Sequence, residues 1–155
     1  MKSVSATQII KKIDETVADI KSLEDVGLSP LNSSYLAKFL VVYISGLYEK
    51  LIKGMLSDKA LFCGDSDSAN FITGYRWYSP TFANIVSLFD NFNKEWGTEL
   101  KKIDDKYKYA ISSIANNKNS IAHGSDVTLT LKDVCDYYND SKVLIEKIDN
   151  ILLGV

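Results

Sequence analysis

The 155-residue sequence is poor in the residues that most often build metal and redox sites. It contains two cysteines, two prolines and a single histidine, His123. Cys63 and Cys135 do not form a CxxC pair, and one histidine cannot complete a zinc site with them. We therefore expect no metal and no cofactor. We interpret both thiols as reduced packing residues of a cytoplasmic protein.

Long hydrophobic runs and common enzyme signatures are also missing. The most apolar run, residues 39–44, is much shorter than the ~20 residues that a membrane helix requires. The first twenty residues mix charged side chains with isoleucines, which is not typical of a signal peptide. We find no glycine-rich phosphate loop, no GxSxG motif and no HExxH motif. These absences predict a soluble protein outside the familiar classes of NTPase, serine hydrolase and zinc protease.

Charge is distributed unevenly along the chain, although the net charge is only −2. Residues 101–118 contain five lysines and two aspartates, whereas residues 124–155 contain three lysines and six acids. The first segment can form a local basic surface of the kind that binds nucleic acid. A solvated, lysine-rich helix face explains it equally well, because lysine is common on exposed helices.

Apolar residues recur at intervals of three and four, the period of amphipathic α-helices. This pattern predicts helices at about 5–25, 34–57, 80–93 and 104–123, and a last helix that begins at Thr130. Residues 61–79 are rich in glycine, serine and aspartate and indicate a long connection with one short helix at 68–73. No segment shows the alternation of a strand. We predict one all-α domain over residues 1–155, an antiparallel bundle of four or five main helices.

Several residues mark where these helices should begin and end. Ser33 and Ser34 can cap the second helix, which is apolar on most sides and should therefore be central. Ser79 followed by Pro80 is typical of an N-cap and a first helical position. We expect the remaining boundary residues to be Thr98 capping a short turn, Gly124 ending a helix, and Thr130 forming a capping box with Asp133.

The single histidine lies in the run Lys118-Asn119-Ser120-Ile121-Ala122-His123-Gly124. Asn119 and His123 are four positions apart and share one helical face. Lys118 is five positions from His123, about 140° around a straight helix. A lone histidine is more often structural than catalytic, so its neighbours must carry the functional interpretation.

We interpret the aromatic cluster Tyr75, Trp77 and Tyr78 as packing residues.

The run K-N-S-I-A-H-G resembles the R-N-x-x-x-H-G motif of HEPN domains, and particularly the R-N-x-I-A-H-G form of the prokaryotic RiboL-PSP-linked type. About seventy residues upstream, an apolar predicted helix contains Glu49-x3-Lys53, similar to the E-x3-K element of some members. The resemblance extends from about Ser34 to Leu153.

This resemblance implies a helical homodimer whose two motifs face each other and cleave RNA without a metal. In such a dimer His123 and its symmetry mate would act as acid and base. Lys118 would stabilise the phosphate charge, and Asn119 would orient a neighbour or donate a hydrogen bond. Glu49 and Lys53 would support the site. The family analogy further implies a toxin or effector of a toxin–antitoxin or antiviral defence system, with a cognate antitoxin or other protein as a partner.

One departure leaves an alternative open. Lys118 occupies the position that is usually arginine, and lysine lacks the planar fork that grips a phosphate at two points. The chain contains one arginine, Arg76, among seventeen lysines, so the change fits its general preference for lysine. The alternative is a catalytically inactive helical module that dimerises or binds a protein.

Overall fold

The computed structural model describes residues 1–154, which form seven α-helices and no strand. The helices are α1 (Val4–Val26), α2 (Pro30–Phe62), α3 (Ser66–Gly74), α4 (Phe82–Phe92), α5 (Lys94–Lys101), α6 (Asp105–Ala122) and α7 (Leu131–Leu153). The predicted all-α bundle is confirmed: α1, α2, α6 and α7 are long, and three short helices join them. Within residues 1–154, no helix is both long and apolar enough to cross a membrane.

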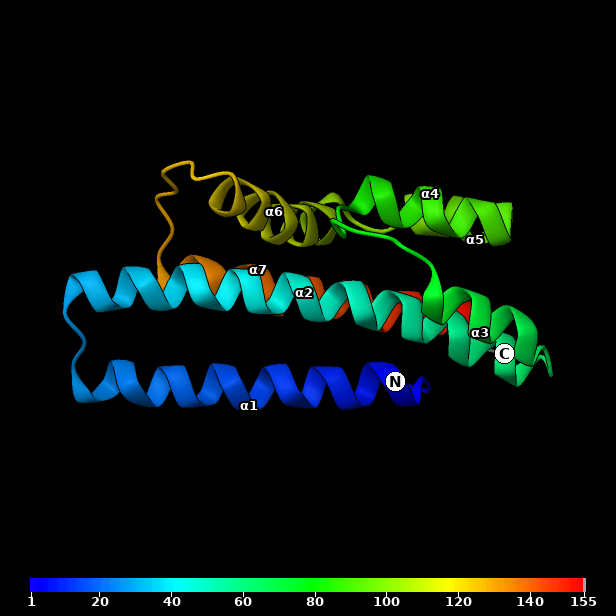
Figure 1. The fold of residues 1–155 in the computed structure, drawn as a ribbon, viewed down its shortest axis with the longest axis horizontal. Helices are drawn as coiled ribbons and strands as arrows, with labels where there is room; N and C mark the ends of the chain where they lie inside the picture. The colour runs from blue at the N-terminus through cyan, green and yellow to red at the C-terminus, as the bar shows by residue number, and fades with distance from the viewer. Residues whose placement is uncertain (155) are drawn as a thin grey trace.

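Helix α2 is the centre of the bundle, as its apolar sequence predicts. It packs against α1, α3, α6 and α7, and Figure 1 shows it between α1 on one side and α6 on the other. Leu40, Ile44 and Leu51 are fully buried along it. Because burying one such side chain contributes ~1.5–3 kcal/mol, the inward residues of α2 are a main source of stability. Any residue fixed on α2 is therefore held on a rigid element.

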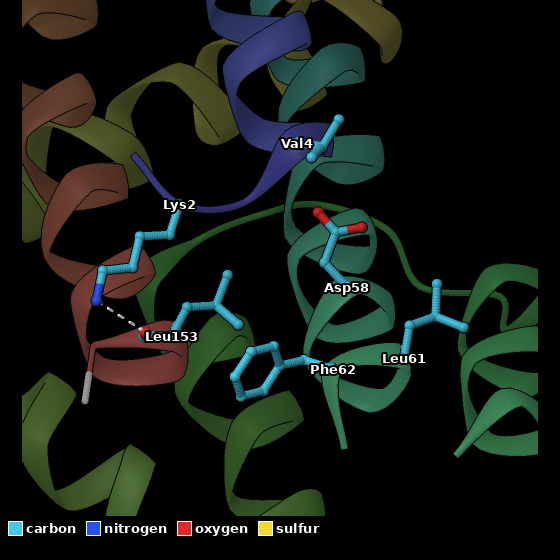
Figure 2. A pocket seen from close by; sticks show the side chains of 6 residues that line it. All are labelled: Lys2, Val4, Asp58, Leu61, Phe62 and Leu153. Carbon is cyan, nitrogen blue, oxygen red and sulfur yellow. Dashed lines mark hydrogen bonds between the residues drawn. The ribbon is translucent and has the colours of Figure 1, made fainter. Parts of the chain in front are cut away.

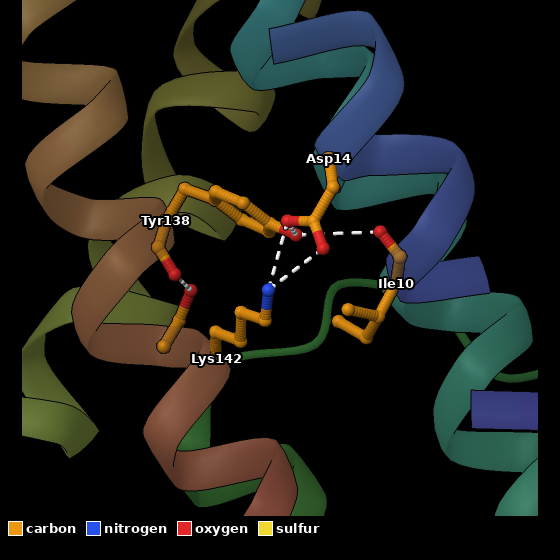
Figure 3. A network of polar contacts seen from close by, with 5 residues as sticks. Ile10, Asp14, Tyr138 and Lys142 are labelled. Atoms are coloured by element: carbon orange, nitrogen blue, oxygen red, sulfur yellow. Dashed lines mark hydrogen bonds and ion pairs between the residues drawn. The ribbon is translucent and has the colours of Figure 1, made fainter. Parts of the chain in front are cut away.

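Helix α1 is attached to the bundle by an apolar stripe and by one polar network. Its buried residues recur every three or four positions: Ala6, Ile10, Ile13, Val17 and Ile20. Figure 3 shows Asp14 of α1 facing α7, where its carboxylate accepts hydrogen bonds from the Tyr138 hydroxyl (2.6 Å) and the Lys142 ammonium (2.7 Å). Burial, together with the bond to Asp14, raises the pKa of Tyr138. The phenol therefore stays neutral and keeps its proton, which it shares with the carboxylate only through the hydrogen bond.

Two predicted helix starts are wrong because other hydroxyl residues provide the caps. Helix α2 begins at Pro30, and the Ser29 side chain accepts a hydrogen bond from the Asn32 N–H, so Ser33 and Ser34 lie inside the helix. Pro30 fits the first helical position because its missing N–H would have no partner there. Helix α4 is capped by Thr81, and Ser79 is not an N-cap.

The connection predicted at residues 61–79 is largely helical. Helix α2 continues to Phe62, and α3 lengthens the short helix predicted at 68–73, which leaves 63–65 and 75–81 as connections. Thr98 does not cap a turn: it lies within α5, whose N-cap is Asn93. The predicted ends of α6 and the capping box of Thr130 with Asp133 are confirmed.

Some side chains that were expected to pack inside are exposed. Cys63 is exposed at the end of α2, so its thiol is not a packing residue, whereas Cys135 is half-buried and packs against the core. Tyr35 and Phe39, two aromatic residues near the start of α2, are 60% and 52% exposed. The first half of α2 therefore presents an apolar face that the described residues do not cover.

Candidate functional site

The motif lies at the C-terminal end of α6, and Gly124 determines where that helix ends. Gly124 has a φ of 74°, a left-handed conformation that glycine adopts without strain. Its N–H donates to the Ile121 carbonyl at 3.1 Å, and the Ser125 N–H donates to the Ser120 carbonyl at 2.9 Å. These two bonds form a Schellman motif, which satisfies carbonyls that the helix end would leave without donors. The chain therefore leaves the helix axis directly after His123.

His123 is the C-cap of α6, and it is exposed. Its backbone N–H donates to the Asn119 carbonyl at 3.0 Å, so the last turn of the helix holds its backbone. Its imidazole makes no hydrogen bond or ion pair within residues 1–154. The ring is thus positioned by the helix end and accessible to a substrate or to another chain.

Lys118 is held by Glu49, a residue of the central helix α2. The Lys118 ammonium lies 3.3 Å from the Glu49 carboxylate, and the two side chains are 26% and 18% exposed. Glu49 is therefore brought to the motif, as the resemblance implies for a supporting residue. A partly buried carboxylate restricts the orientations of a flexible lysine. If the lysine turned away, the carboxylate would remain partly buried without a partner, which is unfavourable.

Asn119 connects α6 to the segment that precedes α4. Its amide donates a hydrogen bond of 2.8 Å to the Ser79 hydroxyl. The Ser79 N–H in turn donates to Glu49 at 3.1 Å, through the same oxygen that receives Lys118. Glu49, Ser79, Lys118 and Asn119 thus form one polar network that joins α2, the segment before α4, and α6.

Ser79 is the residue of this network that the sequence interpretation missed as a site residue. Its φ of 58° lies in the left-handed region, which costs a residue with a side chain ~1–2 kcal/mol. Two contacts hold it there: its carbonyl accepts the Thr81 N–H and the Asn84 amide, both at 2.8 Å. The Ser-Pro dipeptide signalled a helix start, and no local pattern indicated that Ser79 reaches a helix forty positions away.

Lys53 does not join the network, although it follows Glu49 by one helical turn. Its ammonium donates to the Tyr75 carbonyl at 3.1 Å and more weakly to the Thr73 carbonyl at 3.5 Å. A cation is favourable at the C-terminal end of a helix, where carbonyls are unpaired. Lys53 therefore contacts the end of α3 and the start of residues 75–81 and not the polar network.

The lysine-rich segment 101–118 does not form a free basic surface. Each of its five lysines lies within 3.5 Å of a carboxylate: Lys101 with Asp90, Lys102 with Glu99, Lys106 with Asp140, Lys108 with Asp105, and Lys118 with Glu49. The solvated-face interpretation fits these lysines better.

A cavity of about 440 Å³ lies away from the motif, between the N-terminal segment, the end of α2 and the end of α7. Figure 2 shows Leu61, Phe62 and Leu153 around it, with the Lys2 ammonium turned to the Leu153 carbonyl. None of the predicted site residues lines this cavity. Within residues 1–154, no three His, Cys, Asp or Glu residues group in a way that could hold a metal ion.

Comparison with known proteins agrees with the motif and the helical fold. No curated protein and no solved structure matches the sequence. The RiboL-PSP-HEPN family model matches residues 6–154, nearly the whole chain and all seven helices except the first two residues of α1. The chain therefore belongs to the RiboL-PSP-HEPN family.

Proposed function

We propose that the protein is a metal-independent endoribonuclease whose active site forms between two copies of the chain. The observation that carries the proposal is the end of α6, which presents an exposed His123 five positions after a Lys118 that Glu49 holds in place. Family membership makes ribonuclease activity the first function to test.

The chemistry requires an acid, a base and a cation. A base removes the proton of a ribose 2′-hydroxyl, whose oxygen attacks the neighbouring phosphorus. An acid protonates the departing 5′-oxygen, and the products are a 2′,3′-cyclic phosphate and a 5′-hydroxyl. Histidine can serve in either role near neutral pH. Lys118 would stabilise the negative charge that builds on the phosphate oxygens in the transition state.

One chain supplies one histidine, and a symmetric dimer supplies two. A two-fold interface places the same surface of both chains together, so two His123 side chains can meet near its axis. The exposed side chains Tyr35, Phe39 and Val42 recur every three or four positions on α2, and Gly46 and Glu49 continue that face towards the motif. An uncovered apolar face beside the site is a suitable surface for a second copy.

The remaining network residues would position the reacting groups. Glu49 would hold Lys118 until a phosphate shares its ammonium, and Asn119 would fix the last turn of α6 against Ser79. By analogy with the family, we propose that the activity is that of a toxin or defence effector, restrained by an antitoxin or another protein partner.

A mixing experiment tests the composite site. Wild-type chains and His123→Ala chains are unfolded together in equal amounts and refolded, and RNA cleavage is measured in EDTA. If both histidines are needed, only dimers with two wild-type chains are active, and activity falls to about one quarter of an all-wild-type control. Activity of about one half would show that each chain cleaves RNA alone.

A further inference from the structure

Residues 75–78 and one face of α4 enclose a groove of about 310 Å³, which we call the Tyr78 groove. Its lining includes Arg76, Trp77, Tyr78, Asn84, Ser87 and Asn91. A second hollow of about 210 Å³ shares Tyr75, Leu88 and Asn91 with it. The two hollows are therefore neighbours with shared lining residues, beside the segment that leads into Ser79.

Two of the three aromatic residues that line the groove are exposed, whereas Trp77 is partly buried and packs against the core, as predicted. Tyr78 is 64% exposed and Tyr75 is 40% exposed, so the interpretation of this cluster as packing residues is wrong for both. Phe71 is also exposed, and its ring lies 5.9 Å from that of Tyr75 at an interplanar angle of 35°. Exposed aromatic faces are the surfaces on which unpaired bases of single-stranded RNA stack.

The polar residues of the groove suit an RNA strand. Asn84, Ser87 and Asn91 are spaced by three and four positions, so they lie on one face of α4. Side-chain amides both donate and accept hydrogen bonds, as the edge of an unpaired base requires.

The charge of the groove is also complementary to RNA. Arg76 is exposed and forms no ion pair within residues 1–154, unlike the five lysines of residues 101–118. Its guanidinium can bind a phosphate at two points or stack on a base. No acidic residue is among those that line the two hollows in the described chain. A polyanion with flat, polar bases fits this lining better than a cationic or purely apolar ligand.

The groove is linked to the candidate site by hydrogen bonds through Ser79. Asn84, on its wall, donates a 2.8 Å hydrogen bond to the Ser79 carbonyl, and Ser79 contacts both Glu49 and Asn119. Tyr78 is the residue directly before Ser79. A base in the groove would therefore belong to a nucleotide close to the phosphate at Lys118.

We propose that the Tyr78 groove binds an unpaired RNA base and so selects single-stranded substrates for the site at Lys118 and His123. The proposal rests on the proposed function. In a symmetric dimer each site would have two such grooves, one contributed by each chain.

Binding measurements on the full chain test the groove. The probe is a fluorescein-labelled, unstructured ten-nucleotide RNA, and anisotropy is recorded with the His123→Ala background so that the probe stays intact. We expect Tyr78→Leu to raise Kd about tenfold, the effect of losing one base–aromatic stack, and Tyr78→Phe to leave Kd unchanged. Tyr109→Leu is the matched control, because Tyr109 is equally exposed (65%) on the first half of α6.

Photocrosslinking locates the RNA independently. With 4-thiouridine in the probe, we expect crosslinked peptides from residues 75–78 or from α4, and weaker binding of a duplex of the same sequence. If Tyr78→Leu leaves Kd unchanged, or if the crosslinks lie only in other segments, the groove does not bind the RNA. Cleavage through His123 would not be affected by that result. A wild-type protein that binds no RNA would overturn both. If His123→Ala still cleaves RNA and Tyr78→Leu binds RNA more weakly, the catalytic role of His123 is wrong. The proposal that the groove binds RNA would then still hold.

Discussion

Glu49 on α2 and Lys118 on α6 form an ion pair of 3.3 Å although 69 positions separate them in the chain. Both side chains are mostly buried, so the pair is better protected from solvent than a typical surface salt bridge, which contributes ~0–1 kcal/mol. The same carboxylate oxygen accepts the Ser79 N–H. This one oxygen therefore fixes the cation of the motif relative to the central helix.

Substitution of Lys118 tests its use as a phosphate contact. Lys118→Ala should lower the cleavage rate about as severely as His123→Ala, because residues that act in one transition state have non-additive effects. Lys118→Arg should keep or increase the rate, since it restores the planar fork of the family motif. Rates are measured on labelled RNA, with Lys132→Ala as a control in an exposed ion pair. Wild-type cleavage by Lys118→Ala would remove the lysine from the mechanism.

Two substitutions of Ser79 separate the strain of its left-handed backbone from its hydrogen bond with Asn119. Ser79→Gly should relieve the strain of the left-handed backbone and so stabilise the fold by ~1 kcal/mol, partly offset by the loss of the hydrogen bond from Asn119. Ser79→Ala keeps the strain and loses the same bond, so its unfolding free energy should be the lower of the two. Urea denaturation measures both. Both variants should cleave RNA more slowly than wild type, and equal stabilities would refute the assignment of strain.

The exposed face of α2 makes dimerisation testable. Phe39→Glu should shift a dimer towards monomers in light scattering at micromolar concentration, because it places a charge on an apolar interface. Phe62→Glu, at the far end of the same helix, is the control, since Phe62 is even more exposed (72% against 52%). A monomeric wild-type protein with full activity would contradict the composite site.

Two buried tyrosines predict loss of stability at alkaline pH. Burial raises the pKa of both Tyr48 and Tyr138, so each phenol is neutral in the folded chain at pH values where it ionises in the unfolded chain. The stability that they contribute is therefore complete below about pH 10 and falls as the pH rises above it. Tyr48→Phe should flatten that fall in denaturation curves between about pH 9 and pH 11. An unchanged slope would contradict the effect of burial on Tyr48.

The local features of the site were predictable from sequence, and its long-range contacts were not. The spacing of Asn119 and His123 and the glycine at 124 define the end of one helix, which depends on neighbouring residues alone. The resemblance to the family indicated Glu49. Ser79 reaches the site only because residues 75–81 turn back against α6. Three lysines of residues 101–118 pair with carboxylates on other helices: Lys101 with Asp90 of α4, Lys106 with Asp140 of α7 and Lys118 with Glu49 of α2. Such contacts depend on how helices pack, which no periodicity within one segment encodes.

Cleavage of RNA by the wild type and by His123→Ala, measured in EDTA, decides whether His123 is catalytic. We expect the wild type to produce 2′,3′-cyclic phosphate ends, detected by mass spectrometry, and His123→Ala to produce none. The variant should keep its thermal stability, because an exposed side chain usually contributes less than ~0.5 kcal/mol. Cleavage by His123→Ala at the wild-type rate, or a wild type that produces no cyclic ends, would show that the protein is not a ribonuclease that acts through His123.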